Sequence, residues 1–185
     1  RKCGADRSIE KGRCRVGDEI LISRAARHMW EEPSISGTRG SGTVFFTGCS
    51  LKCAFCQNSV ISEDNTHGRA FTTDEFIRLM QELEAQGAHN INLVTPTHFV
   101  PQIISALDIA RPQIPVVYNT GGYEKIDALK RIDPYIDIYL PDMKFYSPTL
   151  SKRYLGKEDY FDVANEAISF MAQKPLKMTG DGKML

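Results

Sequence analysis

Three cysteines within eight residues, Cys49, Cys53 and Cys56, form the densest group of reactive side chains in this sequence. They follow the apolar run 43–47, with three and then two residues between them. Three thiols cannot all pair with one another as disulfides, so at least one sulfur has another role. Thiolates in short runs hold iron–sulfur clusters, and a centre with an open metal position can do chemistry. The spacing therefore predicts a [4Fe–4S] site with three protein ligands and one iron free for a substrate or cofactor.

Two other interpretations of this loop remain open from the spacing alone. A structural zinc site needs a fourth ligand for closed tetrahedral coordination, for which Cys14 and His67 are the candidates. An electron-carrying iron–sulfur protein likewise requires a fourth cysteine ligand. Cys3 and Cys14 are interpreted either as two reduced surface thiols or as a pair that belongs to a second metal site.

A regular alternation of strands and helices begins at residue 43 and positions these cysteines. We expect strands at 43–47, 91–95, 114–118 and 136–140, and helices at 73–86, 99–110 and 124–132 and after Ser147 and Asp159. Strands separated by helices are typical of βα units around a parallel sheet. A full eight-unit barrel takes about 250 residues. The sequence therefore predicts an α/β fold, a partial (β/α) barrel over residues 43–185 that is truncated after about four βα units.

Residues 1–42 are expected to form an irregular N-terminal extension, because they are rich in Gly and Arg. Within it we expect a short strand at 20–22 and a helix that runs to Trp30. Pro33 ends this helix, since the residue before a proline disfavours the α region. The tail 178–185 is expected to form a turn that leads toward another strand.

Polar residues follow each expected strand at its carboxyl end, where parallel βα folds form their sites. The cysteines follow the first strand. The later strand ends carry Thr95, Thr97 and His98, then Asn119 with Gly121 and Gly122, then Asp142 and Lys144. The glycine pair permits close approach of the backbone to a ligand. Asp142 with Lys144 offers both charges to a zwitterion such as an amino acid head group.

A second group of ionisable residues, His28, Glu31 and Glu32, precedes the first core strand. An exposed polar segment is the simpler interpretation, because charged residues are mostly found at the surface. An acid/base group or a metal site is the alternative.

Charge and hydropathy exclude several classes of partner. The chain has 185 residues with 23 basic and 23 acidic side chains, which gives no electrostatic reason to expect nucleic acid or an anionic membrane. No run approaches the roughly 20 apolar residues of a transmembrane helix, and residues 1–6 lack the apolar stretch of a signal peptide. Five cysteines, three of them clustered, do not form a secreted disulfide framework. We therefore expect a cytoplasmic protein, of undetermined oligomeric state.

The Cys-x3-Cys-x2-Cys loop, with Phe55 directly before its third cysteine, resembles that of the radical S-adenosylmethionine (SAM) superfamily. The wider sequence is similar to iron–sulfur proteins labelled as pyruvate formate-lyase activating enzymes, a glycyl-radical-activase-like branch. The segments that carry this similarity are 36–62, 87–99, 117–123 and 137–144. The resemblance covers the chain from about residue 28 to 174.

This resemblance implies a radical enzyme with two cofactors. Cys49, Cys53 and Cys56 would hold a [4Fe–4S] cluster, whose remaining iron is chelated by SAM. One electron from a donor of the flavodoxin or ferredoxin type would release methionine and a 5′-deoxyadenosyl radical, which takes a hydrogen from the substrate. A glycyl radical enzyme is one candidate protein substrate. The resemblance assigns no catalytic residue among the side chains.

The resemblance also implies roles for residues around the cluster. Phe55 would pack near the adenine of SAM, and Asp142 with Lys144 matches an Asp-x-Lys that contacts its methionyl end. The activases carry Gly-Gly-Glu where this chain has the run 95–98, so an oxygen of Thr95 or Thr97 would accept the methionine amino group. His98 and Asn119 complete the expected cofactor contacts.

Overall fold

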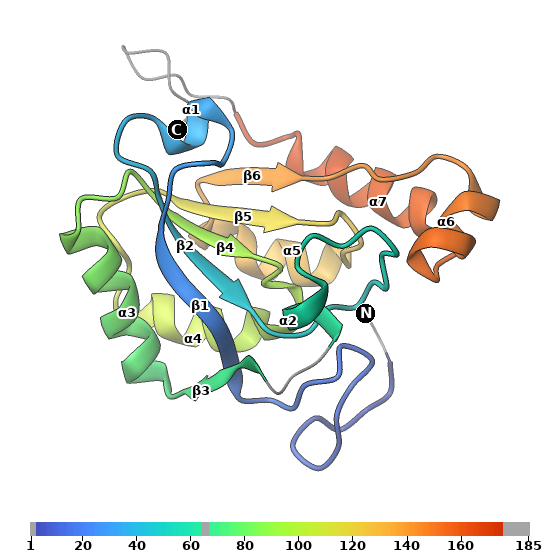
Figure 1. Ribbon diagram of the computed structural model, residues 1–185, viewed down its shortest axis with the longest axis horizontal. Coiled ribbons are helices and arrows are strands. Elements are labelled where there is room, and N and C mark those ends of the chain that lie inside the picture. The colour runs from blue at the N-terminus through green and yellow to red at the C-terminus, as the bar shows by residue number, and fades with distance from the viewer. Residues whose placement is uncertain (1–2, 64–66, 176–185) are drawn as a thin grey trace.

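A six-stranded mixed sheet forms the centre of the protein in its computed structural model, which describes residues 3–63 and 67–175 (Figure 1). The strand order is β3-β1-β2-β4-β5-β6. The strands are β1 (Ile20–His28), β2 (Ser41–Phe46), β3 (Arg69–Phe71), β4 (Ile91–Val94), β5 (Val116–Thr120) and β6 (Ile138–Pro141). β2, β4, β5 and β6 are parallel, whereas β1 is antiparallel to both β2 and β3. The chain is therefore a mixed α/β protein.

The helices separate the parallel strands along the chain. They are α1 (Pro33–Ser36), α2 (Ser59–Glu63), α3 (Thr73–Ala85), α4 (Val100–Ile109), α5 (Ile126–Ile132), α6 (Pro148–Leu155) and α7 (Tyr160–Met171), with short 3₁₀ turns η2 (Thr97–Phe99) and η3 (Asp133–Tyr135). Within residues 3–63 and 67–175, no helix combines the length and apolar character that crossing a bilayer requires.

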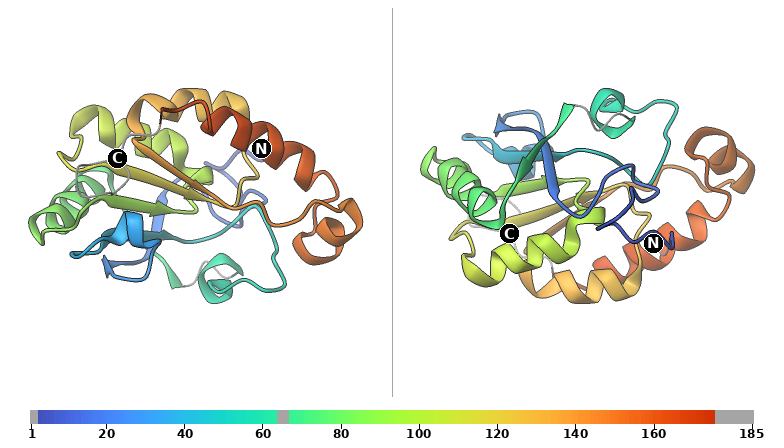
Figure 2. Two further views of the ribbon diagram at one scale, coloured as in Figure 1. Left: turned by 90° about the horizontal axis from the view of Figure 1, so that it is seen from above. Right: turned by 90° about the horizontal axis from the view of Figure 1, so that it is seen from below.

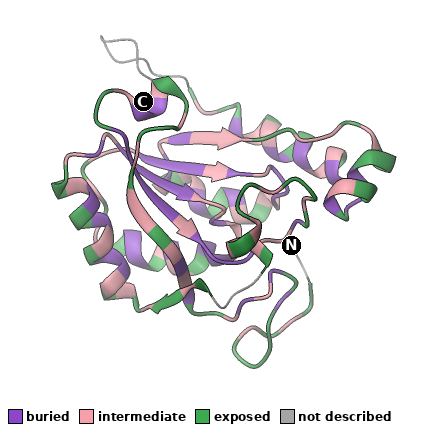
Figure 3. Ribbon diagram, viewed as in Figure 1, coloured by how far each residue is buried: buried purple, intermediate pink, exposed green. Residues whose placement is uncertain are grey.

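Helices α3, α4, α5 and α7 cover one face of the sheet (Figure 2). Their apolar residues pack against strand side chains that alternate toward this face, such as Val44, Leu93 and Tyr118 at one level of the register. Figure 3 shows that β4 and β5 are buried along most of their length. Burial on both faces is typical of parallel strands in α/β proteins, and it makes these strands a rigid support.

The opposite face of the sheet is covered in part by α1. Ile35 packs there against Val117 and Ile138. Asn90 Nδ2 donates a hydrogen bond of 2.8 Å to the Ile35 carbonyl, which fixes α1 on the sheet.

Helix α3 forms as its sequence predicts. Glu75 N donates to Thr72 Oγ1 at 3.2 Å, and Thr72 N donates to Glu75 Oε2 at 2.9 Å, which completes a capping box. Gly87, with φ +82°, follows its end. Ser147 caps α6 as predicted, whereas Asp159 precedes α7 without a side-chain capping bond.

The expected helix up to Trp30 is wrong, because residues 20–28 form the nine-residue strand β1. β1 pairs with β2 from Ile22 opposite Phe46 to His28 opposite Ser41, and its first residues also pair with β3. Two neighbouring strands satisfy its backbone groups, and this pairing outweighs the helix propensity of the local sequence. β1 is thus part of the sheet although it lies within the expected N-terminal extension. β3, α1 and α2 were not anticipated.

Several expected boundaries shift toward the C-terminus. β5 begins at Val116 rather than at residue 114, because Pro115 has no N–H to donate to the strand ladder. Asn119 therefore lies inside β5. α5 begins at Ile126, which leaves Glu124 in the preceding loop, and β6 begins at Ile138 rather than at residue 136. The expected turn at 178–185 lies outside the described residues.

The N-terminal loop, residues 3–19, packs against the start of the cysteine loop, residues 48–58. The guanidinium of Arg7 donates to the carbonyl of His98. Gly48 has φ +84°, and a Cβ at this position would lie 2.4 Å from the carbonyl oxygen of Cys14. The backbone just before the first cysteine of the cluster therefore touches the N-terminal loop directly.

We expect Gly48→Ala to destabilise the protein more than Gly87→Ala. Gly87 also has a positive φ, +82°, but no atom lies within 4 Å of an added Cβ. Its substitution should lower the free energy of unfolding by about 1 kcal/mol, the cost of the backbone conformation alone. Gly48→Ala should lose about 2 kcal/mol or more, because the Cys14 carbonyl must also move. Urea unfolding measures both, and equal losses would show that the N-terminal loop does not pack here.

Candidate metal and cofactor site

The cysteine loop, residues 48–58, leaves the carboxyl end of β2 and lies against the end of α6 (Figure 1). Lys52 N donates to the Leu155 carbonyl at 3.2 Å, and Ala54 N donates to the Tyr154 carbonyl at 2.8 Å. The last carbonyls of a helix have no partner within the helix, so the loop amides satisfy them. This exchange fixes the path of the chain between the first and third cysteines.

All three cysteines of this loop are free thiols of intermediate exposure. The pKa of Cys49 is raised to about 11, chiefly by burial and less by Cys53 and Cys56, whereas a hydrogen bond from Leu51 N and the Lys144 ammonium act in the opposite direction. Burial also raises the pKa of Cys53, against the same lowering effect of Lys144. Burial therefore favours the neutral thiol at Cys49 and Cys53.

A cluster would require these sulfurs to turn toward a common centre. As placed, no three His, Cys, Asp or Glu side chains in the described part of the chain are gathered closely enough to hold a metal ion. Cys56 Sγ instead lies 3.3 Å from Ser62 Oγ. The donor set nevertheless fits an iron–sulfur cluster, because three reduced thiols share one short loop and binding of a metal stabilises the thiolate form. Cys49, Cys53 and Cys56 are the residues that would hold it.

An ion pair between Asp142 and Lys144 lies beside the cysteine loop. Lys144 Nζ is 2.7 Å from Asp142 Oδ2, and the two side chains are 20% and 63% exposed. Burial alone would lower the pKa of Lys144, but the hydrogen bond and the charge of Asp142 outweigh it and raise the pKa. The site therefore contains a permanent ammonium near the thiols and a carboxylate that is accessible to a ligand.

Gly121, just after β5, allows the ion pair and the cysteine loop to meet. A Cβ at Gly121 would lie 3.1 Å from Leu51 Cδ1 and 3.3 Å from Lys144 Cε. Tyr160 Oη accepts a hydrogen bond of 2.9 Å from Lys144 N and lies 2.9 Å from the carbonyls of Gly121 and Asp142. The predicted close approach at this glycine is therefore made by the protein's own side chains.

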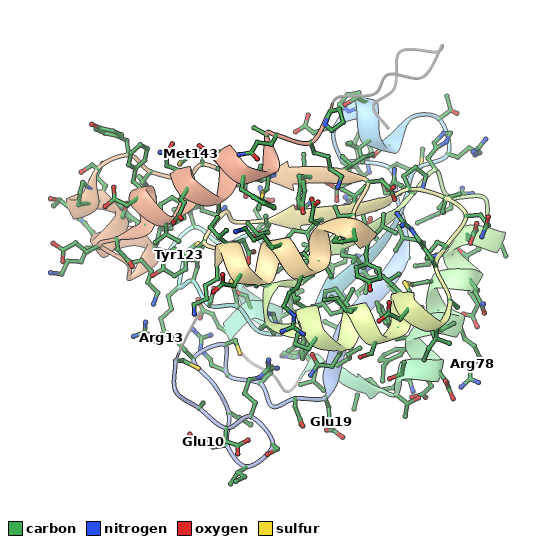
Figure 4. The ribbon with its side chains drawn as sticks, turned by 180° about the vertical axis from the view of Figure 1, so that it is seen from behind. Glu10, Arg13, Glu19, Arg78, Tyr123 and Met143 are labelled. Carbon is green, nitrogen blue, oxygen red and sulfur yellow. The ribbon has the colours of Figure 1, made fainter. Side chains whose placement is uncertain are left out.

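Aromatic side chains line the same end of the sheet. Tyr123, which is labelled in Figure 4, stacks on Tyr160 with ring centroids 6.2 Å apart. Its hydroxyl donates to Asp159 at 2.7 Å. Phe55 is 52% exposed and meets Phe145 edge-on at 5.7 Å. Phe55 therefore presents an accessible ring between two of the cysteines, and its contact with adenine stays a prediction.

Thr95 follows β4 in a conformation that is rare for a β-branched residue. Its φ is +58°, and its N–H donates to the Asn119 carbonyl at 2.9 Å. Residues in this left-handed region cluster at functional sites, where the surrounding structure compensates the strain. The ligand contact of Thr95 stays a prediction.

Thr97 and His98 are engaged within the protein. Thr97 Oγ1 donates to Glu124 Oε1 at 2.5 Å, and His98 Nε2 lies 2.8 Å from the Thr47 carbonyl. Burial lowers the pKa of His98 to about 4, so the ring is neutral and Nε2–H donates. Both side chains lie below the surface of the site, and their expected cofactor contacts stay predictions.

A buried carboxyl group, Glu124, connects the ends of β4 and β5. It accepts hydrogen bonds from the hydroxyls of Thr97 and Thr120, and Tyr118 lies beside it with its hydroxyl also buried. Burial raises the pKa of Glu124 more than the two threonine hydrogen bonds lower it. The sequence placed Glu124 at the start of a helix, and no local pattern separates a buried glutamate there from an exposed one.

We expect Glu124→Gln to reduce the pH dependence of stability. Because the folded-state pKa of Glu124 lies above its ordinary value, the native state keeps the proton to higher pH than the unfolded chain. The contribution of Glu124 is fully present below the unfolded-state pKa and is lost as pH rises through the folded-state pKa. Urea unfolding between about pH 4 and 8 should show this decline in the wild type and not in the variant. A wild-type-minus-variant difference that does not change with pH would contradict the prediction, and exposed Glu166→Gln is the control.

Comparison with known proteins agrees with this arrangement. A sequence model of the radical SAM superfamily matches residues 43–178. An uncharacterized protein of Methanocaldococcus jannaschii is 31% identical over 170 residues, which cover 88% of this chain and 49% of that protein. The chain spans about half the length of this relative. The match over residues 43–178 includes the cysteine loop, Thr95, Gly121 and the Asp142–Lys144 pair, and this chain belongs to the radical SAM superfamily.

Proposed function

We propose that this chain binds a [4Fe–4S] cluster and SAM and uses them to abstract a hydrogen atom from a substrate. The observation that carries the proposal is that a loop with three free thiols has two of them, Cys49 and Cys53, beside the Asp142–Lys144 pair at the carboxyl end of the sheet. A cluster-binding loop and a pair of opposite charges suit a cofactor whose methionyl end is a zwitterion. Membership of the superfamily supports both cofactors.

Each side chain has a role in this proposal. Cys49, Cys53 and Cys56 hold the cluster, while Lys144 and Asp142 bind the charged groups of the methionyl end. When bound, the cluster would pass one electron from a donor of the flavodoxin or ferredoxin type to the sulfonium of SAM, which yields methionine and a 5′-deoxyadenosyl radical.

The remaining contacts orient SAM around this centre. A Thr95 oxygen accepts from the methionine amino group, and the Phe55 ring packs on the adenine. Thr97, His98 and Asn119 support these contacts from the strand ends. The proposed frame for them is a partial (β/α) barrel built on the parallel strands β2, β4, β5 and β6.

A narrower proposal is that the substrate is a glycine of a partner protein, as in activation of a glycyl radical enzyme. The Asp-x-Lys at 142–144 supports this version, and the run Thr95 to His98 departs from the activase motif at the neighbouring strand end. Transfer of deuterium from a glycine-labelled partner into 5′-deoxyadenosine is its test.

The cysteine substitutions test the proposal at its centre. Cys49→Ser, Cys53→Ser and Cys56→Ser should each abolish the broad visible absorbance of the cluster after anaerobic reconstitution, because a serine oxygen is a poor ligand for iron–sulfur clusters. These variants should also release no 5′-deoxyadenosine when SAM and dithionite are added. Cys3→Ser, an exposed thiol outside the loop, should retain both properties.

Three outcomes would contradict the radical mechanism. A wild-type protein that holds a cluster and forms no 5′-deoxyadenosine is not a SAM-cleaving enzyme. Loss of the cluster in Cys14→Ser would favour an electron carrier with a fourth cysteine ligand. Metal analysis that finds zinc and no iron after anaerobic purification would favour a structural zinc site.

We expect Lys144→Gln to weaken SAM binding by about tenfold or more, because a charge-assisted hydrogen bond to the methionyl carboxylate is lost. Equilibrium dialysis of the cluster-loaded protein measures this affinity. Lys152→Gln is the matched control, since Lys152 lies on α6, is 69% exposed and pairs with Glu158. Unchanged affinity in Lys144→Gln, at equal iron content, would remove Lys144 from the SAM site.

A further inference from the structure

The face of the sheet that carries α1 holds a polar cluster, of which the proposed cofactor site uses only Asn119. Asn92 pairs in register with Val117, and Val94 pairs with Asn119. Residues opposite each other in a register share a face, and Val117 packs under α1. Asn92 and Asn119 therefore both point to the α1 face, away from helices α3, α4, α5 and α7.

The carboxylate of Glu31 lies against these two carboxamides, on the α1 face of the sheet. It belongs to the segment between β1 and α1, and its N–H donates to Ser36 Oγ at 3.0 Å, which fixes its backbone. Asn119 Nδ2 donates to Glu31 Oε2 at 3.4 Å. Burial raises the pKa of Glu31, and an interaction with the Asn92 side chain acts in the opposite direction. Glu31, which lies between β1 and β2 in the sequence, thus meets side chains of β4 and β5.

Asn92 has unused hydrogen-bonding capacity. It is 0% exposed, and both Oδ1 and Nδ2 lack a hydrogen bond of normal geometry. Buried amide groups are nearly always paired, and leaving one unpaired costs free energy. A donor group bound beside Glu31 would supply a partner for Asn92 Oδ1. If that group moved the Glu31 carboxylate, the carboxylate could accept from Asn92 Nδ2.

The carboxylate of Glu31 also lacks a fixed cation. Among the described residues, no Lys or Arg forms an ion pair with it, and His28 is the basic group near it. The His28 ring is held edge-on against Phe45, with centroids 6.2 Å apart. A half-buried acceptor with two carboxamides and no permanent counter-charge is suited to a ligand that brings its own positive charge and several N–H donors.

This cluster adjoins the cofactor site through one residue. The carbonyl of Asn119 accepts from Thr95 N at 2.9 Å, while its side chain reaches Glu31. A group held at Glu31 would therefore lie on the α1 face of the same strand, β5, which leads to Gly121 beside the Lys144 side chain.

We propose that Glu31, Asn92 and Asn119 bind a positively charged, N–H-bearing group of the substrate, a guanidinium or an ammonium. The assignment to a substrate rests on the proposed radical function, whereas the binding itself does not. His28, the basic group near Glu31, packs edge-on against the apolar ring of Phe45.

The test is an NMR titration of the full 185-residue chain with methylguanidinium and, separately, with methylammonium. The side-chain amide signals of Asn92 and Asn119 should shift saturably with at least one of them, and the tighter probe identifies the group. Tetramethylammonium carries the charge without N–H donors and should leave these signals in place. Glu31→Gln should weaken binding by about tenfold or more, because it removes a charge-assisted hydrogen bond. Glu32→Gln, an exposed neighbour, is the matched control and should bind as the wild type does.

Any of three results overturns the site. The first is no saturable shift with either probe in the wild type, a result that does not depend on any variant. The second is equal binding of tetramethylammonium, and the third is equal affinity in Glu31→Gln. The titration needs neither cluster nor SAM, so failure to release 5′-deoxyadenosine would overturn the proposed function and leave the binding result standing.

Discussion

Parallel pairing of β2, β4, β5 and β6 is the constraint on which the rest of this structure depends. Backbone hydrogen bonds fix the register of these strands, so their carboxyl ends meet along one edge. The cysteine loop, Thr95, Gly121 and Lys144 each follow one of these ends. Residues almost a hundred positions apart in sequence therefore contact one another, and a cofactor that needs thiolates, charges and an aromatic ring can find them at a single edge.

β5 carries polar side chains on both faces of the sheet. Tyr118 and Thr120 point toward the helices and surround the buried carboxyl of Glu124, whereas Asn119 between them points to the α1 face and meets Glu31. The two-residue alternation of a strand is the reason. β5 thus supports the carboxyl end of the sheet through the side chains that face the helices. It also presents a polar side chain, Asn119, on the α1 face.

The cysteine loop is held from two directions that are distant in sequence. The end of α6 accepts hydrogen bonds from its amides, and the N-terminal loop contacts Gly48 just before the first cysteine. These contacts constrain the loop backbone while the thiols themselves stay free. A loop of this kind can turn its sulfurs toward a metal without reorganising the chain that carries them.

The sequence by itself determined the features that local rules govern: the helix that begins after Thr72, the βα order after residue 43, and the spacing of the three cysteines. The tertiary structure alone decided that residues 20–28 form a strand, because that outcome depends on pairing with β2 and β3 rather than on local propensity. It also decided that Glu124 is buried and that Glu31 meets Asn119. Burial and long-range contacts are properties of the packed chain, and no spacing within a single segment encodes them.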